Sequence, residues 1–314
     1  RVEFPGIAFS PNNEINGLTM GGVGDGTEVD YVQVSYSGDD SFEWFGGTVN
    51  AKHIIALRGL DDDFDTDIGY TGMVQYAVSL RDPAQADVSG SRSFESDNDG
   101  SGSSNTPQTK PIFSNVSVFG PLATSGTPIN SNYSEIINIR LNSATNIYNS
   151  IFAGWPTGLR IDGAASQANA TANLLRIENT FLAGMNDMFK SSFEEAYFME
   201  DASPNRHNDT LSTNPELMIT DPFNLTNPNF LPMAGSPVLI RSYWCKEVSG
   251  TVAYDNTAST PLSGVTVNVN DGSKGIVQST TTDASGNYTF DYVFEGAYTL
   301  SASSTAAHGG INST

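Results

Sequence analysis

Basic residues are scarce in this 314-residue chain, and their scarcity excludes several partners. The chain carries 14 Lys and Arg against 35 Asp and Glu, which gives a net charge of −21. A surplus of that size repels nucleic acids and anionic membrane surfaces, so neither is expected as a partner. No apolar run approaches the ~18 residues of a membrane span, so no membrane span is predicted.

Cysteine and histidine are also rare. The single cysteine, Cys245, cannot form an intrachain disulfide and is predicted to be a small buried apolar side chain. The three histidines, His53, His207 and His308, are scattered, and no HExxH or CxxC pattern accompanies them. A zinc site is therefore not expected. The chain also lacks GxSxG, the motif that would point to a serine hydrolase.

Glycine, serine, threonine, asparagine and aspartate are abundant, with 30 glycines, which is the composition of a turn-rich β protein. An acidic block, "DDSFEWFGG" at 39–47, returns 22 residues later as "DDDFDTDIG" at 61–69, and a fainter copy, "FESDNDG", begins at residue 94. Short apolar runs precede the first two blocks. Strands that recur at this interval without helices between them favour a solenoid of stacked parallel strands over a sandwich.

The spacing lengthens after the second block, and "RDPAQADVSG" at 81–90 is predicted to be a looped-out insertion. Strand-like segments continue to about residue 184, and "SSFEEAYFMED" at 191–201 is expected to form a short helix. From about residue 247 the pattern changes to short alternating strands joined by tight turns. That pattern predicts a small β-sandwich.

Two stretches resemble known families. Residues 1–240, through "SYSGDDSFEWFGGTVNAKHIIALRGLDDDFDTDIGYTG", "SFESDNDGSGSSNTPQT" and "FAGWPTGLRIDG", resemble secreted right-handed parallel β-helix proteins of Bacteroidota and related bacteria. Members of that family usually carry more chain before "RVEF", so a preceding segment is expected. Residues 247–305, through "SGTVAYDNTASTPLSGVTVNV", resemble the carboxypeptidase-regulatory-like or surface-protein B-type sandwiches that act as spacers in exported bacterial proteins.

The fold class is therefore predicted to be all-β. We expect a right-handed parallel β-helix over residues 1–246 and a small Ig-like β-sandwich over residues 247–305. "HGGINST" is similar to the start of a dockerin-like or sorting segment, so residues 306–314 are interpreted as a linker to such a segment. Both resemblances imply an extracellular protein of a bacterial cell surface, and neither brings an established chemistry.

Stacking at a spacing of ~4.8 Å brings the acidic blocks together. Phe42 and Phe64 are predicted to point inward as an aromatic ladder, with the flanking acids outward. Three interpretations of these acids stay open: they are solvated or cap turns, they bind calcium, or they catalyse. The calcium interpretation takes as ligands Asp39, Asp40, Asp61, Asp62, Asp63 and Asp65. Because the blocks lack the glycine and glutamate of an EF-hand loop, calcium would have to bind between coils.

The catalytic interpretation is a polysaccharide-cleaving enzyme that uses paired carboxylates. Its candidates are Asp40, Glu43, Asp62 and Asp63. A regular ladder differs from the unequal acid and base of such an enzyme, and the nearby Arg58 and Arg81 are predicted to be ion-pair partners. Trp44 and Trp155 are candidates for stacking on a sugar, with core packing as the alternative.

The resulting prediction is a non-catalytic structural or adhesive protein. The ends of a β-helix expose strand edges, which favour self-association into a fibre or array. A polysaccharide-binding or polysaccharide-cleaving β-helix enzyme is the alternative, with carbohydrate as the partner.

Overall fold

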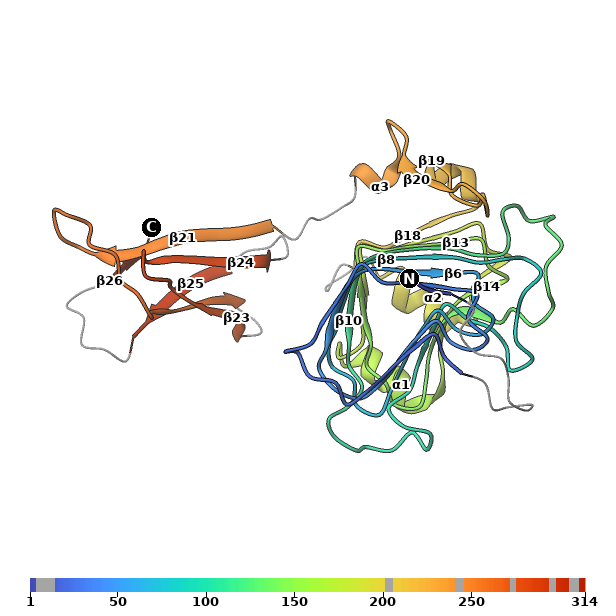
Figure 1. The fold of residues 1–314 in the computed structure, drawn as a ribbon, viewed down its shortest axis with the longest axis horizontal. Coiled ribbons are helices and arrows are strands. Elements are labelled where there is room, and N and C mark those ends of the chain that lie inside the picture. The colour runs from blue at the N-terminus through green and yellow to red at the C-terminus, as the bar shows by residue number, and fades with distance from the viewer. Residues whose placement is uncertain are drawn as a thin grey trace. The chain divides into compact units, whose positions relative to one another are not determined.

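The computed structural model describes residues 1–3, 15–200, 206–240, 246–271, 275–293, 298–304 and 311–313. The chain divides into two compact units, Arg1–Ser242 and Tyr243–Thr314. Two parallel sheets and one antiparallel strand pair build the first unit, and antiparallel strands build the second (Figure 1). The predicted fold class, a parallel β-helix followed by an Ig-like β-sandwich, is confirmed. Cys245 lies outside the described residues.

Two long parallel sheets form the first unit, and the view in Figure 1 runs nearly along the stack, so that successive coils overlap. The first sheet contains β1 (Val2–Glu3), β3 (Glu28–Asp30), β4 (Gln33–Ser35), β6 (Asn50–Leu57), β8 (Met73–Leu80), β10 (Ile112–Phe119), β12 (Asn146–Tyr148), β13 (Ile151–Ala153), β15 (Arg176–Glu178), β16 (Phe181–Ala183) and β18 (Asp209–Leu211). The second sheet contains β2 (Leu18–Gly21), β5 (Phe42–Phe45), β7 (Phe64–Asp67), β9 (Phe94–Ser96), β11 (Glu135–Ile139), β14 (Thr157–Ile161) and β17 (Asp187–Phe189).

The 22-residue repeat sets the register of the second sheet. Phe42 pairs with Phe64, and Phe64 pairs with Phe94 one coil further on. The ring centroids of Phe42 and Phe64 are 5.9 Å apart, and those of Phe64 and Phe94 are 5.2 Å apart. All three rings are buried, so the predicted inward aromatic ladder is confirmed.

Helices and a hairpin complete the first unit. The helix predicted at 191–201 is present as α2 (Ser192–Phe198), and the hydroxyl of Ser191 accepts a hydrogen bond from the Phe193 N–H at its start. A second helix, α1 (Gly163–Thr171), precedes β15. The insertion at 81–90 contains no strand, as expected. Among the described helices, none is long and apolar enough to cross a membrane.

The last part of the first unit packs on the first sheet and covers its later strands. It consists of the 3-10 helix η1 (Asn214–Leu217), β19 (Ile219–Asp221), β20 (Asn229–Pro232) and α3 (Pro237–Ile240). The ring of Phe230 stacks on Phe119 with centroids 5.2 Å apart, and Ile219 joins the same apolar cluster. The buried apolar side chains of this cluster are therefore shielded from solvent.

The second unit is a sandwich of two antiparallel sheets, β24-β21-β26 and β23-β22-β25. Its strands are β21 (Lys246–Tyr254), β22 (Thr266–Asp271), β23 (Gly275–Thr281), β24 (Asn287–Val293), β25 (Tyr298–Ser303) and β26 (Ile311–Ser313). Val252, Val267 and Phe290 lie in its core. Because β26 pairs with β21, residues 311–313 belong to the sandwich, and the prediction of a linker over 306–314 is wrong for them.

Candidate functional site

Asp40 and Asp62 connect neighbouring coils through the backbone. Oδ1 of Asp40 accepts a hydrogen bond of 2.9 Å from the N–H of Asp62, and Oδ1 of Asp62 accepts one of 2.6 Å from the N–H of Arg92. Both side chains are buried, so the expectation that the flanking acids point outward into water is wrong here. The reason is that backbone N–H groups in the turns need acceptors, and these carboxylates provide them.

Asp63 belongs to a buried ion pair. Its Oδ1 lies 2.9 Å from Nη1 of Arg81, and its Oδ2 accepts a hydrogen bond of 2.6 Å from the Ser79 hydroxyl. Neither charged side chain is exposed, and the Arg81 guanidinium also lies over the ring of Tyr133. Since both oxygens of Asp63 already have partners in the interior, the residue is removed from the calcium ligands and from the catalytic candidates.

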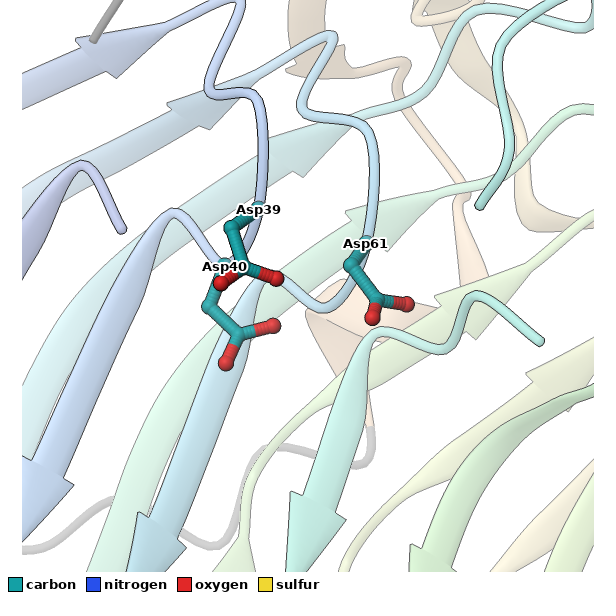
Figure 2. Close-up of side chains that lie close together, drawn as sticks. All are labelled: Asp39, Asp40 and Asp61. Atoms are coloured by element: carbon teal, nitrogen blue, oxygen red, sulfur yellow. The ribbon is translucent and has the colours of Figure 1, made fainter. Parts of the chain in front are cut away.

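The other predicted acids come together in two overlapping groups. In the first, Asp39, Asp40 and Asp61 lie on turns of two successive coils (Figure 2). In the second, Asp40 lies beside Glu43 and Asp65, which pair in register on β5 and β7. Within each group, one oxygen from every carboxylate lies within 4.8 Å of the others. We call these five residues the acidic cluster.

Burial and mutual repulsion raise the pKa values in the acidic cluster. Burial raises the pKa of Asp40 well above its ordinary value, and the charges of Asp65 and Asp61 add to the shift. Burial, followed by the charges of Asp39 and Asp67, raises the pKa of Glu43 to about 8. The pKa of Asp65 is raised in the same way. Among the described residues, no ion pair involves Asp40, Glu43 or Asp65, although the charge of Arg140 acts on Asp65.

Later coils of the same sheet supply cations. Glu135, at the start of β11, lies 3.0 Å from Nζ of Lys190 and 3.2 Å from Nη1 of Arg160. Burial alone would raise the pKa of Glu135, but the hydrogen bond from Ser134 and these two cations hold it at about 2. Arg140 likewise donates two hydrogen bonds, of 2.8 and 2.9 Å, to Asp97.

The other predicted residues have structural positions. Trp44 and Trp155 are 0% exposed and pack against Tyr70 and Tyr133, respectively. Complete burial leaves no ring face for a sugar, so neither tryptophan is a stacking residue. Arg58 pairs with Asp82, and this pair, like that of Arg81, confirms the predicted ion-pair role.

Glu43 is the residue that the predicted calcium ligand set omitted. Its signal was present in the sequence, because Glu43 and Asp65 are 22 residues apart, which is the spacing of the repeat. Asn16 donates a hydrogen bond from Nδ2 to Oε2 of Glu43, and no repeat predicted that contact.

Two family models match the chain. The model described as a pectate-lyase-like beta helix domain matches residues 1–217, and the model described as a carboxypeptidase regulatory-like domain matches residues 247–309. Comparison with curated proteins and with solved structures finds no match.

Proposed function

The chain belongs to the pectate-lyase-like β-helix family, and from this premise we propose that it is an extracellular, non-catalytic structural or adhesive protein on the surface of a Bacteroidota-type bacterium. The order of its domains supports this role, because a solenoid followed in sequence by a carboxypeptidase regulatory-like sandwich suits an exported surface protein. Fold alone does not establish an activity, so the argument depends on the acidic residues.

The use of those acids in holding the coils together is the observation that carries the proposal. Asp63 neutralises Arg81 in the interior, while Asp40 and Asp62 accept backbone N–H groups from the following coil. Three of the four carboxylates that a polysaccharide-cleaving enzyme would use are thus structural. An acid that forms part of the fold is poorly placed to exchange protons with a substrate during turnover.

Calcium is the cation that we propose for the acidic cluster. Its ligands would be carboxylate oxygens of Asp39, Asp40, Glu43, Asp61 and Asp65, which come from two coils and form two overlapping groups of three, each close enough to share an ion. Calcium accepts 6–8 oxygen ligands in flexible geometry, whereas magnesium requires a tighter octahedron. A bound divalent ion would return these carboxylates to the charged form and join the two coils.

Polysaccharide cleavage is the second candidate function, and the pKa of Glu43 favours it. A carboxyl group with a pKa of about 8 is protonated at neutral pH, as a general acid must be. One oxygen of Asp65 lies within 4.8 Å of one oxygen of Glu43, near the ~5–5.5 Å separation of a retaining glycosidase.

An assay for products distinguishes the two functions. The protein is incubated with neutral and acidic polysaccharides, with and without calcium, and reducing ends and unsaturated products are measured. The non-catalytic role predicts neither product. Cleavage that is abolished by Glu43→Gln and retained by Glu195→Gln, a control at an exposed position on α2, would establish the enzyme instead.

Assembly through the ends of the β-helix is also part of the proposal. Among the described strands, β1 and β18 end the pairing path of the first sheet, and β2 and β17 end that of the second. Strand edges favour pairing with another chain, which would produce a fibre or array. Light scattering and electron microscopy test this, and a stable, monodisperse monomer would exclude it.

A further inference from the structure

Three aromatic rings form a row along the first sheet. Asp30 pairs with Lys52 and Lys52 pairs with Gln75, so the residues that follow them, Tyr31, His53 and Tyr76, occupy one column. The centroids of Tyr31 and His53 are 4.5 Å apart with their planes 8° from parallel, and those of His53 and Tyr76 are 5.2 Å apart at 13°. We call these three residues the aromatic row.

The aromatic row is exposed, unlike the tryptophans. Tyr31 is 77% exposed and Tyr76 is 43% exposed. Because His53 covers one face of the Tyr31 ring, an exposure of this size leaves the opposite face open to solvent. Nδ1 of His53 lies 2.7 Å from Oδ1 of Asp30, and this contact fixes the orientation of the imidazole in the middle of the row.

The three residues of the aromatic row have a backbone conformation that is energetically unfavourable for large side chains. Tyr31, His53 and Tyr76 have φ values of 54°, 48° and 57°, in the left-handed region. In the following coils the same column is occupied by asparagine, at Asn115, Asn149 and Asn179, with φ values of 57°, 51° and 53°.

Asparagine is among the residues that adopt the left-handed region most readily, whereas a bulky tyrosine there is unusual. Stacking between the rings offsets part of this cost, but buried rings would provide the same stacking and also fill the core. Strained and exposed rings therefore indicate selection for contact with something outside the chain.

We propose that the aromatic row binds a neutral carbohydrate, with the open face of Tyr31 against the C–H face of a sugar ring. Aromatic rings suit this contact because a sugar is apolar on its faces and polar at its edges. The residues that directly precede His53 and Tyr76, the exposed Lys52 and the half-buried Gln75, supply hydrogen-bonding groups for the sugar hydroxyls. The proposal deepens the adhesive role proposed above and rests on it.

Charge selects a neutral glycan over an acidic one. The chain has a net charge of −21, and Asp30 lies directly beside Tyr31. A polyuronate would meet a repulsive field over most of the molecule, which lowers both its local concentration and its affinity. The single lysine beside the aromatic row, Lys52, does not reverse that field.

Native electrophoresis in gels that contain a polysaccharide tests the proposal. Hydroxyethyl cellulose, xyloglucan and dextran are the neutral probes, and polygalacturonate is the acidic one. We expect at least one neutral polymer, and not polygalacturonate, to retard the protein. The double variant Tyr31→Asn/Tyr76→Asn should bind about tenfold more weakly, as expected for the loss of aromatic stacking.

The choice of variants separates binding from folding. Asparagine is the residue that the chain itself places in this column, so the double variant is expected to keep the unfolding temperature of the wild type. Tyr36→Asn is the matched control, because Tyr36 is a half-buried tyrosine with φ of 57° outside the aromatic row. Tyr31→Phe preserves the ring and should keep binding within about twofold of the wild type.

Four results would overturn the proposal. They are no retardation by any neutral polymer, equal retardation of the double variant and the wild type, loss of binding in Tyr31→Phe, and dimerisation through Tyr31 without glycan, seen by light scattering. The last would assign the row to contacts between copies of the chain. Release of products from the same polymers would instead contradict the non-catalytic role and leave the binding result unchanged.

Discussion

Two groups of carboxylates on the second sheet have similar burial and opposite ionisation. Glu43 on β5 and Glu135 on β11 are 7% and 2% exposed, respectively. The pKa of Glu43 is raised to about 8, while that of Glu135 is lowered to about 2. Arg160 and Lys190 lie within 3.2 Å of Glu135, whereas the charges that act on Glu43 come from other acids.

Burial raises the pKa of both Glu43 and Glu135, so the difference between them comes from the neighbouring charges and hydrogen-bond donors. A buried carboxylate needs an opposite charge or hydrogen-bond donors to remain ionised. The later coils provide that charge from the chain itself, through Arg92, Arg140, Arg160 and Lys190. In the coil of β5, Asp40 and Glu43 form no ion pair among the described residues, and calcium is proposed to fill the same role there.

Of the changes considered, removal of the buried Arg81 guanidinium is expected to lower the free energy of unfolding most. Arg81→Met leaves Asp63 buried without its partner, and breaking a buried ion pair in this way costs about 3–5 kcal/mol of the free energy of unfolding. Urea denaturation followed by circular dichroism measures the loss. Arg58→Met is the control, because the Arg58–Asp82 pair is partly exposed and should matter much less. Equal losses in the two variants would contradict the dependence on burial.

The repeat in the sequence predicts the register but not the partners of the acids. Equal coil lengths place Phe42 on Phe64 and Glu43 on Asp65, so the 22-residue spacing is sufficient for both contacts. Asp63 directly precedes β7 and Arg81 directly follows β8, so spacing within one sheet carries no information about their pairing. Burial of Asp40 and Asp62 depends on turn geometry, which the repeat also does not specify.

The positions of the aromatic residues illustrate the same limit. Side chains alternate along a strand, so an inward Phe42 implies an inward Trp44, and its burial was predictable from the ladder. Tyr31, His53 and Tyr76 recur at 22 and 23 residues, but nothing in that spacing indicates that a left-handed backbone would carry them. Exposure of the aromatic row could therefore be found only in the structure.

Addition of calcium is expected to change the stability of the folded state by an intermediate amount. An ion that binds only the folded state stabilises it by about 2.7 kcal/mol at a hundred times Kd, so the unfolding temperature should rise with millimolar calcium and fall with a chelator. Magnesium should substitute poorly. Asp65→Asn should blunt the rise, whereas Asp187→Asn, an exposed position on β17 in the same sheet, should not.

Sodium chloride at matched ionic strength is the control for screening, because salt weakens repulsion between acids without occupying a site. If sodium chloride and calcium raise the unfolding temperature equally, and Asp65→Asn behaves like Asp187→Asn, the acidic cluster binds no calcium. Glu43 and Glu135 would then differ only in whether the carboxyl group is ionised, and no bound ion would take the place of the Lys and Arg side chains found near Glu135.

The smallest effect is expected in the dependence of the free energy of unfolding on pH. Glu43 should make the folded state less stable as pH rises, and Glu135 should make it less stable as pH falls. Glu43 has an ordinary pKa of 4.5 and a folded-state pKa of about 8. Between these values the folded state holds a proton that the unfolded state has lost, so stability falls as pH rises. Glu135 has a folded-state pKa of about 2, so its contribution is complete above 4.5 and is lost as pH falls toward 2.

Glutamine variants at these two positions measure both signs. In calcium-free buffer Glu43→Gln should be more stable than the wild type at pH 8, by on the order of 1 kcal/mol, and equal to it near pH 4, because glutamine resembles the protonated acid. Glu135→Gln should be less stable than the wild type at pH 7, and the difference should disappear toward pH 2. Saturating calcium should reverse the advantage of Glu43→Gln, because the ion binds the charged form that glutamine cannot adopt. Denaturant titrations at each pH test this crossover, and parallel profiles for the two variants would show that neighbouring cations do not set the ionisation of these acids.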